Sequence, residues 1–562
     1  MPTAILSPNA KQQFLDNAGN PAASYRLYTY AANTTTPRAT YTNRAGSVAN
    51  ANPIILDARG EAIIYLSPGV VYDYVLKTDQ DVTIWTREDV IADAGDANAV
   101  TFLQEGTGAV TRSSQDKMRE RISVLDFGAV GDGVTNDTAA FQKAIAAAVK
   151  RELYVPKRKY LVDPLTITEP MVICGDGAGL VSSVDSGTVF IPNSNTSNVF
   201  VVDTTAEVTF RDFAIVHQGS ATAGAGIVLS ETSPSLGVGN LFSTVDNVRF
   251  ENMYIGVDAV SASSFRISDC VFWNIRPNGF GIRLDNTIHD DQGDQCIDGN
   301  TFHATASSLS ATGLHWIGGG GMRFVNNKVL MNRAIFANLA TAQATAQFII
   351  NANSFDANQG PDATAVMVYL VVGSGTIPFE NIVVNGNIFI GYYSMTSALI
   401  VAGLPAAKVS KVAVTGNNVI NVTPGAFTGS AAVVFADVDD FLANDNLILG
   451  SGSACGILTT ASCTNGSVMD NRIRGFTTAK SVAGTGVVSR GITNSGVTAS
   501  VSDGGVISHG LAVTPTKVWV NGSVAAQTYG AFGLTSSQFQ VSVRNTAGAS
   551  GSAATIYWMV EA

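Results

Sequence analysis

Acidic residues crowd into one short segment of the chain. Asp290, Asp291, Asp294 and Asp298 lie within nine residues, although charged residues make up only 14% of the sequence. Carboxylates at short distance repel one another, which raises the pKa of some of them. A neutral acid beside an ionised one is the pair that cleavage of a glycosidic bond requires. The segment is therefore a candidate catalytic loop, and a solvated loop is the alternative.

The residue order around this cluster does not fit a metal-binding loop. An EF-hand needs the order D-x-D-x-D-G and a closing Glu, which residues 285–298 lack. The five cysteines also lack the paired C-x-x-C spacing of a zinc site. We expect no metal ion and no cofactor, and we interpret the cysteines as buried free thiols.

An imperfect repeat extends from about residue 208 to residue 475. Each repeat has a marker residue that is followed two places later by a large apolar residue, and successive markers are 22 to 35 residues apart. That range suits one coil of a solenoid with loops of variable length. The pairs are Phe213/Ile215, Val248/Phe250, Cys270/Phe272, Asn300/Phe302, Asn327/Val329, Asn353/Phe355, Asn387/Phe389, Asn418/Ile420, Asn446/Ile448 and Asn471/Ile473.

The two columns of this repeat have different expected roles. Residues two apart on a strand share one side of the sheet, so the apolar column should point inward. Each fully buried side chain of that column should contribute about 1.5–3 kcal/mol. The seven asparagines from Asn300 to Asn471 should stack and hydrogen-bond from coil to coil. We interpret them as structural.

The residue three places after each marker should point outward. Neighbouring coils lie about 4.8 Å apart, so Glu251 and Asp356, four coils apart, are separated by about 19 Å, too far for one catalytic pair. Glu251 could instead pair with Asp291 or Asp294. Solvated strand ends are the alternative. The outward set is Glu251, Trp273, His303, Leu330 and Asp356.

Together the loop and the column form a predicted sugar site. One carboxylic acid would protonate the leaving oxygen, while a second carboxylate activates water or attacks C1. The aromatic rings would line the groove. The predicted catalytic residues are Asp291, Asp294 and Glu251, and the predicted substrate-binding residues are Trp273, His303, His289 and Asp290.

The run that begins at Ile122 joins a strand, a glycine-dense turn and a helix. Gly128, Gly131 and Gly133 can take positive φ without steric cost. Asn136 or Asp137 is expected to cap a helix over 137–150, whose apolar residues recur at helical spacing. Such a helix can close the open end of a stack of strands. The order G-x-x-G-x-G lacks the Lys-Ser/Thr of a phosphate-binding loop.

This run resembles the opening motif of the pectate-lyase-like superfamily, as found in tailspikes of tailed phages. The resemblance implies an all-β fold with a right-handed parallel β-helix of about ten or more coils over residues 122–490. Residues 1–90 are similar to virion-attachment modules of phage tail fibres and spikes, through Tyr28–Tyr41, Ala51–Gly60 and Val82–Trp85. Residues 91–121 should be a connector, and residues 491–562 a small β domain that clamps a trimer or binds glycan.

These resemblances imply a homotrimeric tailspike on the phage tail, made in the host cytoplasm. Its N-terminal domain would dock to phage tail or adaptor proteins. Its shaft would recognise a bacterial surface polysaccharide and depolymerise it by endo-glycosidic hydrolysis. A non-enzymatic adhesin is one alternative. The other is a polysaccharide lyase, with a cation or base among Arg249, Arg283, His289, Lys328 and Arg333.

Charge and hydropathy exclude other partners. The chain has 33 basic and 44 acidic residues and a net charge of −11, so we expect no nucleic acid partner. The longest apolar run, near 363–372, is too short to span a bilayer, so we expect no membrane insertion. We find no signal-peptide pattern at the start of the sequence.

Overall fold

The structure is a computed structural model of the chain. The chain divides into two compact units, Met1–Arg121 and Ile122–Ala562. The described residues are 5–6, 12–67, 69–91, 100–178, 187–203, 207–219, 221–230, 240–260, 262–286, 293–318, 320–338, 347–357, 360, 362, 364–372, 379–421, 426–451, 455–490, 493–509 and 514–561.

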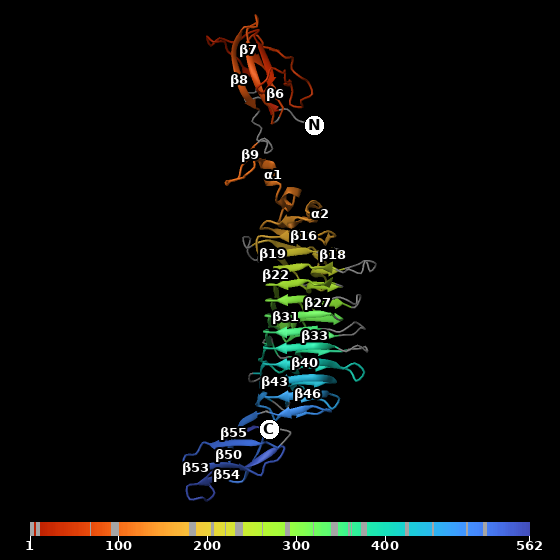
Figure 1. Cartoon of the computed structure of the whole chain (residues 1–562), viewed down its shortest axis with the longest axis vertical. Helices are drawn as coiled ribbons and strands as arrows, with labels where there is room; N and C mark the ends of the chain where they lie inside the picture. The colour runs from red at the N-terminus through yellow and green to blue at the C-terminus, as the bar shows by residue number, and fades with distance from the viewer. Residues whose placement is uncertain are drawn as a thin grey trace. The chain divides into compact units, whose positions relative to one another are not determined.

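The first unit consists of short antiparallel strands (Figure 1). Its main sheet has the order β4-β3-β7-β8, and Leu27, Tyr72 and Leu76 at its centre are fully buried. This unit therefore has a hydrophobic core of its own. Its elements are β1 (Ile5–Leu6), β2 (Gln12–Gln13), β3 (Arg26–Ala31), β4 (Ile54–Ile55), β5 (Glu61–Ala62), β6 (Tyr65–Leu66), β7 (Val71–Lys77), β8 (Thr83–Ile91), β9 (Thr101–Phe102), β10 (Arg112–Ser113) and α1 (Ser114–Met118).

The glycine-dense turn begins the second unit and adopts the predicted backbone. Gly128, Gly131 and Gly133 have φ of 92°, 69° and 78°. A Cβ at Gly131 would lie 2.6 Å from Cδ of Arg158, so this position has no room for a side chain. The 3-10 helix η1 (Val124–Phe127) precedes the turn.

Two polar residues secure the start of helix α2 (Thr138–Ala147), which lies within the predicted range 137–150. The Asp137 carboxylate does not cap the helix but accepts hydrogen bonds from the backbone N–H groups of Val130 and Gly131, at 2.7 and 3.0 Å. The Asn136 side chain accepts the N–H of Thr138 at 3.0 Å. Asp137 thus holds the glycine turn, and Asn136 satisfies a helix N–H group.

The apolar side of α2 covers the first coils of the shaft. Phe141 is fully buried, and its ring packs edge-on against Tyr160 and Phe190 at centroid distances of 5.2 and 5.4 Å. The predicted function of this stripe, to close the open end of the stack, agrees with these contacts.

The shaft is a right-handed parallel β-helix, as predicted, with three strand layers per coil (Figure 1). The first and second layers, together with β52 (Lys517–Gly522) and β55 (Ala554–Glu561), form one 28-stranded sheet, because β19 and β22 are long enough to belong to both layers. The third layer is a separate parallel sheet of 12 strands. Each coil passes through the layers in that order.

The bounds of the strands are as follows. The first layer contains β11 (Ile122–Ser123), β13 (Glu152–Tyr154), β16 (Met171–Cys174), β19 (Val208–Val216), β22 (Thr244–Glu251), β25 (Arg266–Ser268), β28 (Gln295–Asp298), β31 (Gly321–Val325), β34 (Gln347–Asn351), β37 (Glu380–Asn385), β40 (Val409–Thr415), β43 (Val438–Asn444), β46 (Thr464–Met469) and β49 (Val488–Arg490). The second layer contains β12 (Asp132–Asn136), β14 (Lys159–Val162), β17 (Val189–Pro192), β26 (Val271–Trp273), β29 (Thr301–His303), β32 (Lys328–Leu330), β35 (Ser354–Ala357), β38 (Ile388–Gly391), β41 (Asn418–Asn421), β44 (Leu447–Leu449), β47 (Arg472–Arg474) and β50 (Thr493–Val501). The third layer contains β15 (Leu165–Ile167), β18 (Phe200–Asp203), β20 (Ala225–Ser230), β23 (Ile255–Val260), β27 (Phe280–Asn286), β30 (Thr312–Gly318), β33 (Arg333–Asn338), β36 (Val366–Val371), β39 (Ser397–Ala402), β42 (Ala431–Ala436), β45 (Cys455–Thr459) and β48 (Thr478–Val482).

The predicted apolar column lies inside the shaft. Phe250, Phe272 and Phe302 stack with centroid distances of 4.9 and 4.7 Å and nearly parallel planes. Glycines on the third layer make room for these rings: a Cβ at Gly256 or Gly281 would lie 2.5 or 2.6 Å from a phenylalanine ring atom. The ring stack and the glycines therefore depend on each other.

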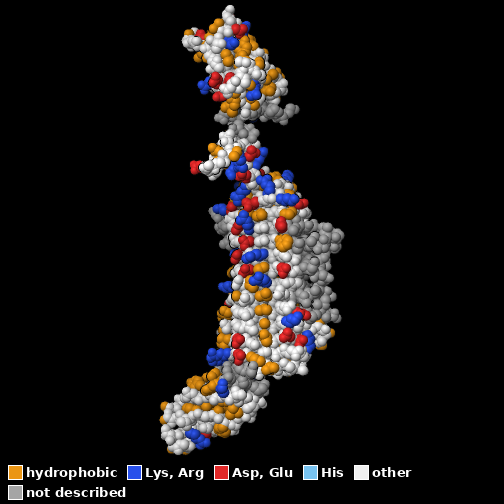
Figure 2. All heavy atoms as spheres, in the orientation of Figure 1, with side chains coloured by type: hydrophobic (Ala, Val, Ile, Leu, Met, Phe, Trp, Pro, Cys, Tyr) orange, Lys and Arg blue, Asp and Glu red, His pale blue; other side chains and the backbone are white. Residues whose placement is uncertain are grey.

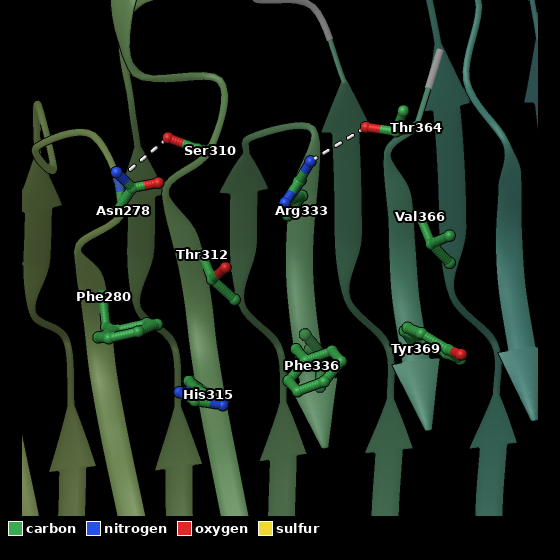
Figure 3. A pocket seen from close by; sticks show the side chains of 11 residues that line it. Asn278, Phe280, Ser310, Thr312, His315, Arg333, Phe336, Thr364, Val366 and Tyr369 are labelled. Atoms are coloured by element: carbon green, nitrogen blue, oxygen red, sulfur yellow. Dashed lines mark hydrogen bonds between the residues drawn. The ribbon is translucent and has the colours of Figure 1, made fainter. Parts of the chain in front are cut away.

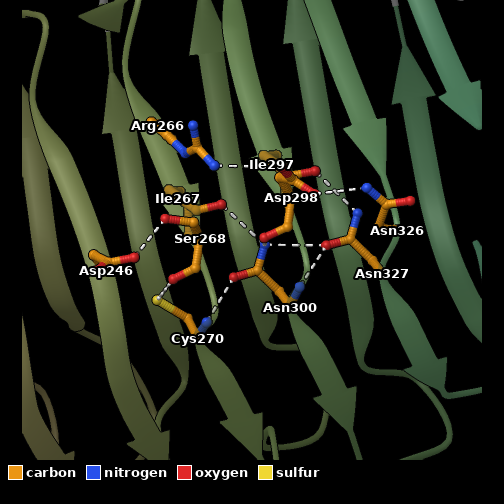
Figure 4. A network of polar contacts seen from close by, with 10 residues as sticks. All are labelled: Asp246, Arg266, Ile267, Ser268, Cys270, Ile297, Asp298, Asn300, Asn326 and Asn327. Atoms are coloured by element: carbon orange, nitrogen blue, oxygen red, sulfur yellow. Dashed lines mark hydrogen bonds and ion pairs between the residues drawn. The ribbon is translucent and has the colours of Figure 1, made fainter.

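The asparagine column forms a buried ladder at the corner between the first two layers (Figure 4). The backbone N–H of Asn300 donates to Oδ1 of Asn327 at 2.9 Å, and the N–H of Asn327 donates to Oδ1 of Asn353 at 2.8 Å. One member of the prediction was wrong by one residue: Asn417 is buried in the ladder, and Asn418 is exposed. Val419, not Ile420, is the matching inward residue.

Polar residues replace the apolar columns in the last coil. Lys480 continues the inward column after Ile457, and Ser489 continues another after Val468. The Lys480 ammonium donates to the hydroxyl of Ser489, and its side chain is 1% exposed. Burial lowers the pKa of Lys480 to about 8.

The C-terminal strands belong to the same compact unit as the shaft. Strand β50 pairs in parallel with β47 at Arg472 and Thr493, and antiparallel with β55. The second layer thus continues into the sheet β50-β55-β52, which lies within the small β domain predicted over residues 491–562. The C-terminal strands are β51 (Gly505–Ser508), β52 (Lys517–Gly522), β53 (Gln527–Phe532), β54 (Gln538–Asn545) and β55 (Ala554–Glu561). Two further strands, β21 (Asn240–Leu241) and β24 (Ala262–Ser263), form a separate two-stranded parallel sheet.

Candidate functional site

A groove of the shaft lies on the third layer (Figure 3). It crosses the four consecutive strands β27, β30, β33 and β36 and encloses about 430 Å³. Loops that enter these strands form its rim. It is lined by Asn278, Phe280, Ser310, Thr312, His315, Arg333, Ile335, Phe336, Thr364, Val366 and Tyr369.

A row of rings forms the floor of this groove. His315, Phe336 and Tyr369 are register partners on successive coils, so their side chains point outward at one level. Their ring centroids are 5.2 and 5.6 Å apart, and Phe280 stacks on His315 at 4.7 Å. Flat apolar faces beside a few fixed polar groups are the usual composition of a small-molecule or glycan pocket.

Polar groups occupy the rim. Nη2 of Arg333 lies 3.2 Å from both a carboxylate oxygen of Asp362 and the hydroxyl of Thr364. Hydrogen bonds from Thr364 and the ion pair with Arg333 outweigh burial, so the pKa of Asp362 is lowered. On the two preceding coils, the hydroxyl of Ser310 accepts a hydrogen bond from the backbone N–H of Asn278 at 3.0 Å. The rim therefore offers a positive charge and hydroxyl groups held by local contacts.

His315 is the titratable ring of the groove. Burial, assisted by the charge of Arg283, lowers its pKa, so the imidazole is neutral at neutral pH. Its Nδ1 is buried and has no hydrogen-bond partner among the described residues. Arg283 itself is held by two hydrogen bonds of 2.7 Å to Asp258. A neutral imidazole of this kind can accept a proton from a bound ligand.

The structure aligns the column that was predicted on the second layer. Glu251 pairs in register with Trp273, and His303 with Leu330. The rings of Trp273 and His303 stack at 4.0 Å with an interplanar angle of 10°. Trp273 is 37% exposed, so this stack forms an aromatic surface on the outside of the shaft.

The acids of this column have contrasting surroundings. The Glu251 carboxylate is bound by Nε and Nη2 of Arg249, each at 2.9 Å, and the Arg249 guanidinium lies 5.7 Å from the Trp273 ring centroid. Burial raises the pKa of Asp356, although the charge of Lys328 opposes it. Burial also lowers the pKa of His303. Glu251 is thus engaged in an ion pair, whereas Asp356 lies closer to its neutral form.

The predicted acidic loop does not bring Asp294 to Glu251. Asp294 is exposed and directly precedes β28 on the first layer. Glu251 ends β22 and is level with Trp273 and, one coil further, His303. Eight residues of chain, including β28, the corner and most of β29, separate Asp294 from His303. His289, Asp290 and Asp291 lie outside the described residues, so their predicted roles stay predictions.

Short loops join the second-layer strands to the third-layer strands. The groove lies on one side of these loops, and the second-layer column from Glu251 to Asp356 lies on the other. Leu330 ends a second-layer strand, and Arg333 begins the next third-layer strand after only two residues. The sequence analysis identified Arg283 and Arg333 among the candidate cations of a lyase. It did not identify His315, Phe336 and Tyr369. A signal existed: each of these three rings lies between two inward apolar residues of its strand, Leu314 and Trp316, Ile335 and Ala337, and Val368 and Leu370.

Within the described residues, no three His, Cys, Asp or Glu side chains are grouped so as to hold a metal ion. The described helices include none with the length and apolar character that a transmembrane span needs.

Comparisons with known proteins agree with this architecture. Residues 121–360 match the family described as rhamnogalacturonase A/epimerase, pectate lyase-like. A tailspike protein mutant of E. coli bacteriophage HK620, solved in complex with a pentasaccharide, has the same fold, with a TM-score of 0.50, 12% identity, and coverage of 84% of this chain and 98% of that one.

Curated relatives match over shorter segments. A capsule-specific depolymerase of Klebsiella phage K5-2 is 36% identical over 107 residues, which are 18% of this chain and 13% of that protein. The pre-neck appendage protein of Bacillus phage B103 is 28% identical over 179 residues, 30% of this chain and 21% of that one. The chain thus spans at most about a fifth of the length of these two relatives. Residues 121–360 of the shaft thus match a pectate-lyase-like family, and the chain is similar to phage tailspikes and depolymerases.

Proposed function

We propose that this chain is a tailspike of a phage virion that binds a bacterial surface polysaccharide in the groove of the third layer and depolymerises it. The N-terminal unit would attach to phage tail or adaptor proteins, and the mature spike would be a homotrimer. The similarity to phage depolymerases and tail appendages supports this assignment.

The groove is the observation that carries the proposal. It crosses four coils, which are about 14 Å from first to last. The rings of His315, Phe336 and Tyr369 follow that length, so successive sugar rings can lie against successive coils. Arg333 and Thr364 on the rim can bind the polar edges of the same sugars.

Two cleavage chemistries fit different residues. In hydrolysis, one carboxylic acid protonates the leaving oxygen and a second carboxylate activates water. Asp291 can share these roles with Asp294 or with Glu251, but Asp294 and Glu251 are not brought together. In elimination, His315 takes the C5 proton of a uronate, a C4–C5 double bond forms, and the leaving oxygen departs with a proton from a second acid. His315 lines the groove itself, which favours elimination as a second candidate.

One experiment tests binding and cleavage together. The purified protein is incubated with host polysaccharide, and chain length, reducing ends and ultraviolet absorbance are followed. Hydrolysis shortens the chains without new absorbance, whereas elimination adds the absorbance of an unsaturated sugar. Chains that are bound but not shortened would indicate an adhesin, and absent binding to any surface glycan of the host would overturn the proposal.

Variants separate the two chemistries. Hydrolysis predicts that Asp291→Asn or Asp294→Asn abolishes cleavage and leaves glycan binding intact. Elimination predicts that His315→Gln abolishes cleavage and that both Asp→Asn variants retain it. Phe336→Ala should weaken binding in either case. Phe242→Ala is the matched control, because Phe242 is 58% exposed on the shaft outside the groove.

A further inference from the structure

Two arginines lie on the coils on either side of His315. Arg283 is the register partner of His315 on the preceding third-layer strand, β27. Arg333 begins β33 on the following coil, where it is the register partner of Thr312. Arg333 lines the groove, and Arg283 adjoins it through His315. Neighbouring coils are about 4.8 Å apart, so a sugar ring that covers the imidazole is also close to both arginines.

Both arginines belong to ion pairs in which the carboxylate is buried and the guanidinium is exposed. The side chain of Arg283 is 36% exposed and that of its partner Asp258 is 10% exposed. For Arg333 and Asp362 the values are 37% and 12%. Asp258 also lies on the coil before Arg283, away from His315. A ligand in the groove therefore meets the two cations first, and the negative charges lie deeper in the protein.

Each guanidinium keeps N–H groups for a ligand. Asp258 accepts hydrogen bonds from Nε and Nη2 of Arg283, each at 2.7 Å, whereas Asp362 and Thr364 contact only Nη2 of Arg333. Nε of Arg333 is buried without a partner, so local hydrogen bonds satisfy only part of this group. No described residue accepts a hydrogen bond from Nη1 of either arginine. Since guanidinium geometry matches that of a carboxylate, each arginine can bind a second one.

The charge of these groups favours an acidic sugar over a neutral one. The hydroxyl groups of a neutral sugar can accept hydrogen bonds from the same N–H groups. A sugar carboxylate gains more, because hydrogen bonds between ionised groups are roughly twice as strong as those between neutral groups. The half-buried rings of His315 and Phe336 beside the arginines reduce contact with water, which strengthens the attraction.

The chain as a whole does not attract anions. Its net charge is −11. Figure 2 shows Lys and Arg side chains beside Asp and Glu side chains on the visible face of the shaft, so charges of both signs are mixed there. At long range an acidic polysaccharide is repelled, and its binding must depend on local contacts. The exposed guanidinium groups of Arg283 and Arg333 can provide such contacts.

We infer that the groove selects an acidic polysaccharide, and that Arg283 and Arg333 bind a carboxylate of the sugar that covers His315. Asp258 and Asp362 are then positioning residues, because they hold the two guanidinium groups while the sugar contacts the arginines. This assignment rests on the proposed function and adds the class of its substrate. It is compatible with both cleavage chemistries, since the glycosidic bonds of an acidic polysaccharide can be hydrolysed or eliminated.

Carboxyl reduction of the glycan tests the inference. The surface polysaccharide of the host is prepared in native form and in a form in which carbodiimide and borohydride have converted each carboxylate to an alcohol. In titration calorimetry, the wild-type chain should bind the native form at least about tenfold more tightly. Equal affinities for the two forms would overturn the inference and leave the proposed function intact. Binding to neither form of any host surface glycan would overturn both.

Variants assign the preference to the two arginines. Arg283→Gln and Arg333→Gln should each weaken binding of the native form about tenfold and change binding of the reduced form less than about twofold. Asp258→Asn should also reduce the preference, without a direct contact to the sugar. Lys411→Gln is the matched control, because Lys411 is another exposed cation, paired with the more buried Glu380, outside the groove. An equal loss for both glycan forms would mean that the arginines bind hydroxyl groups, and would overturn the inference.

The source of the carboxylate is identified with the same assay. Mild acid removes pyruvate ketals from a polysaccharide and leaves uronic acids in place. A preference that survives this treatment assigns the site to a uronic acid, and a preference that disappears assigns it to a ketal; both support a carboxylate. A glycan that is acidic only through phosphate is unchanged by carboxyl reduction, and tight binding of such a glycan would overturn the inference.

Discussion

The inside and the outside of the shaft follow opposite rules. Inside, the same residue type recurs coil after coil, as in the ladder that contains Asn300, Asn327 and Asn353. Outside, neighbouring coils present different chemistry at one position, as in the sequence Glu251, Trp273 and His303. Since every coil must stack on the next, interior positions admit few residue types. Exterior positions meet solvent or ligand, so each coil can carry a different group.

The first way to break this comparison is to interrupt the ladder. Asn353→Ala removes the acceptor of the Asn327 N–H and the donor to the Phe324 carbonyl, and it leaves both groups buried. We expect a loss of about 2–4 kcal/mol in unfolding free energy. Ser354→Ala, at the adjacent outward position, should cost less than about 0.5 kcal/mol. Chemical denaturation of both variants measures the difference, and equal losses would contradict the rule.

The buried lysine provides the second test. The pKa of Lys480 is lowered from 10.5 to about 8 by burial. The unfolded chain therefore binds this proton more tightly, and stability should rise between about pH 8 and pH 10.5, where only the unfolded state is protonated. Lys480→Met should be more stable than wild type at pH 7, by up to about 3 kcal/mol, and lack that rise. Thermal midpoints against pH check it; a wild-type profile identical in shape to that of the variant would refute it.

A smaller interior change sharpens the comparison further. A methyl group at Gly281 would lie 2.6 Å from the Phe302 ring and from the carbonyl of Gly313. Gly281→Ala should therefore destabilise the protein by about 1–3 kcal/mol through overpacking. Gly530→Ala is the control, because the nearest atom to its Cβ would be the Ser542 hydroxyl at 3.7 Å. If both variants unfold at the same temperature, the glycine is not required by the ring stack.

The smallest expected effect on stability is on the outside. Trp273→Ala removes an exposed ring that stacks on His303, and we expect a change of about 1 kcal/mol or less in stability. If the column is a sugar surface, as predicted from the sequence, glycan affinity should fall about tenfold in titration calorimetry. Unchanged affinity would indicate that the glycan binds in the third-layer groove, and that Trp273 and His303 only pack against each other.

The interior columns could be predicted from the sequence because they recur at regular spacing. The Phe and Asn columns lie at the corner between the first and second layers. The strands on both sides of that corner are short and closely spaced, so their register can be read directly from the sequence. The error at Asn418 arose because that coil has two adjacent asparagines, and only Asn417 reaches the ladder. Third-layer strands follow loops of different length, such as the two residues before Arg333 and the eight before Thr312. Their register could not be counted, so the groove was missed.

The candidate site was predictable only in part for the same reason. The column from Glu251 to Asp356 could be aligned because it follows the asparagine corner at a fixed distance. The ion pair of Glu251 with Arg249 depends on side-chain contacts that no spacing reveals. The stack of His315 on Phe280 joins residues 35 positions apart across a loop, and its chemistry emerges only when the coils are in place.

The two ends of the coil stack have a consequence for solubility. A parallel β-helix exposes backbone donors and acceptors on its terminal coils, and an unprotected end invites another chain to continue the sheet. At the first end, Phe141 of helix α2 packs against the apolar core. At the other end, the Lys480 ammonium and the Ser489 hydroxyl occupy the interior positions that apolar side chains hold in the other coils. These residues mark the two ends of the apolar interior. At the second end, the pairing of β50 with β47 and with β55 occupies the second-layer edge of the last coil, and we expect it to hinder end-to-end pairing of separate rods.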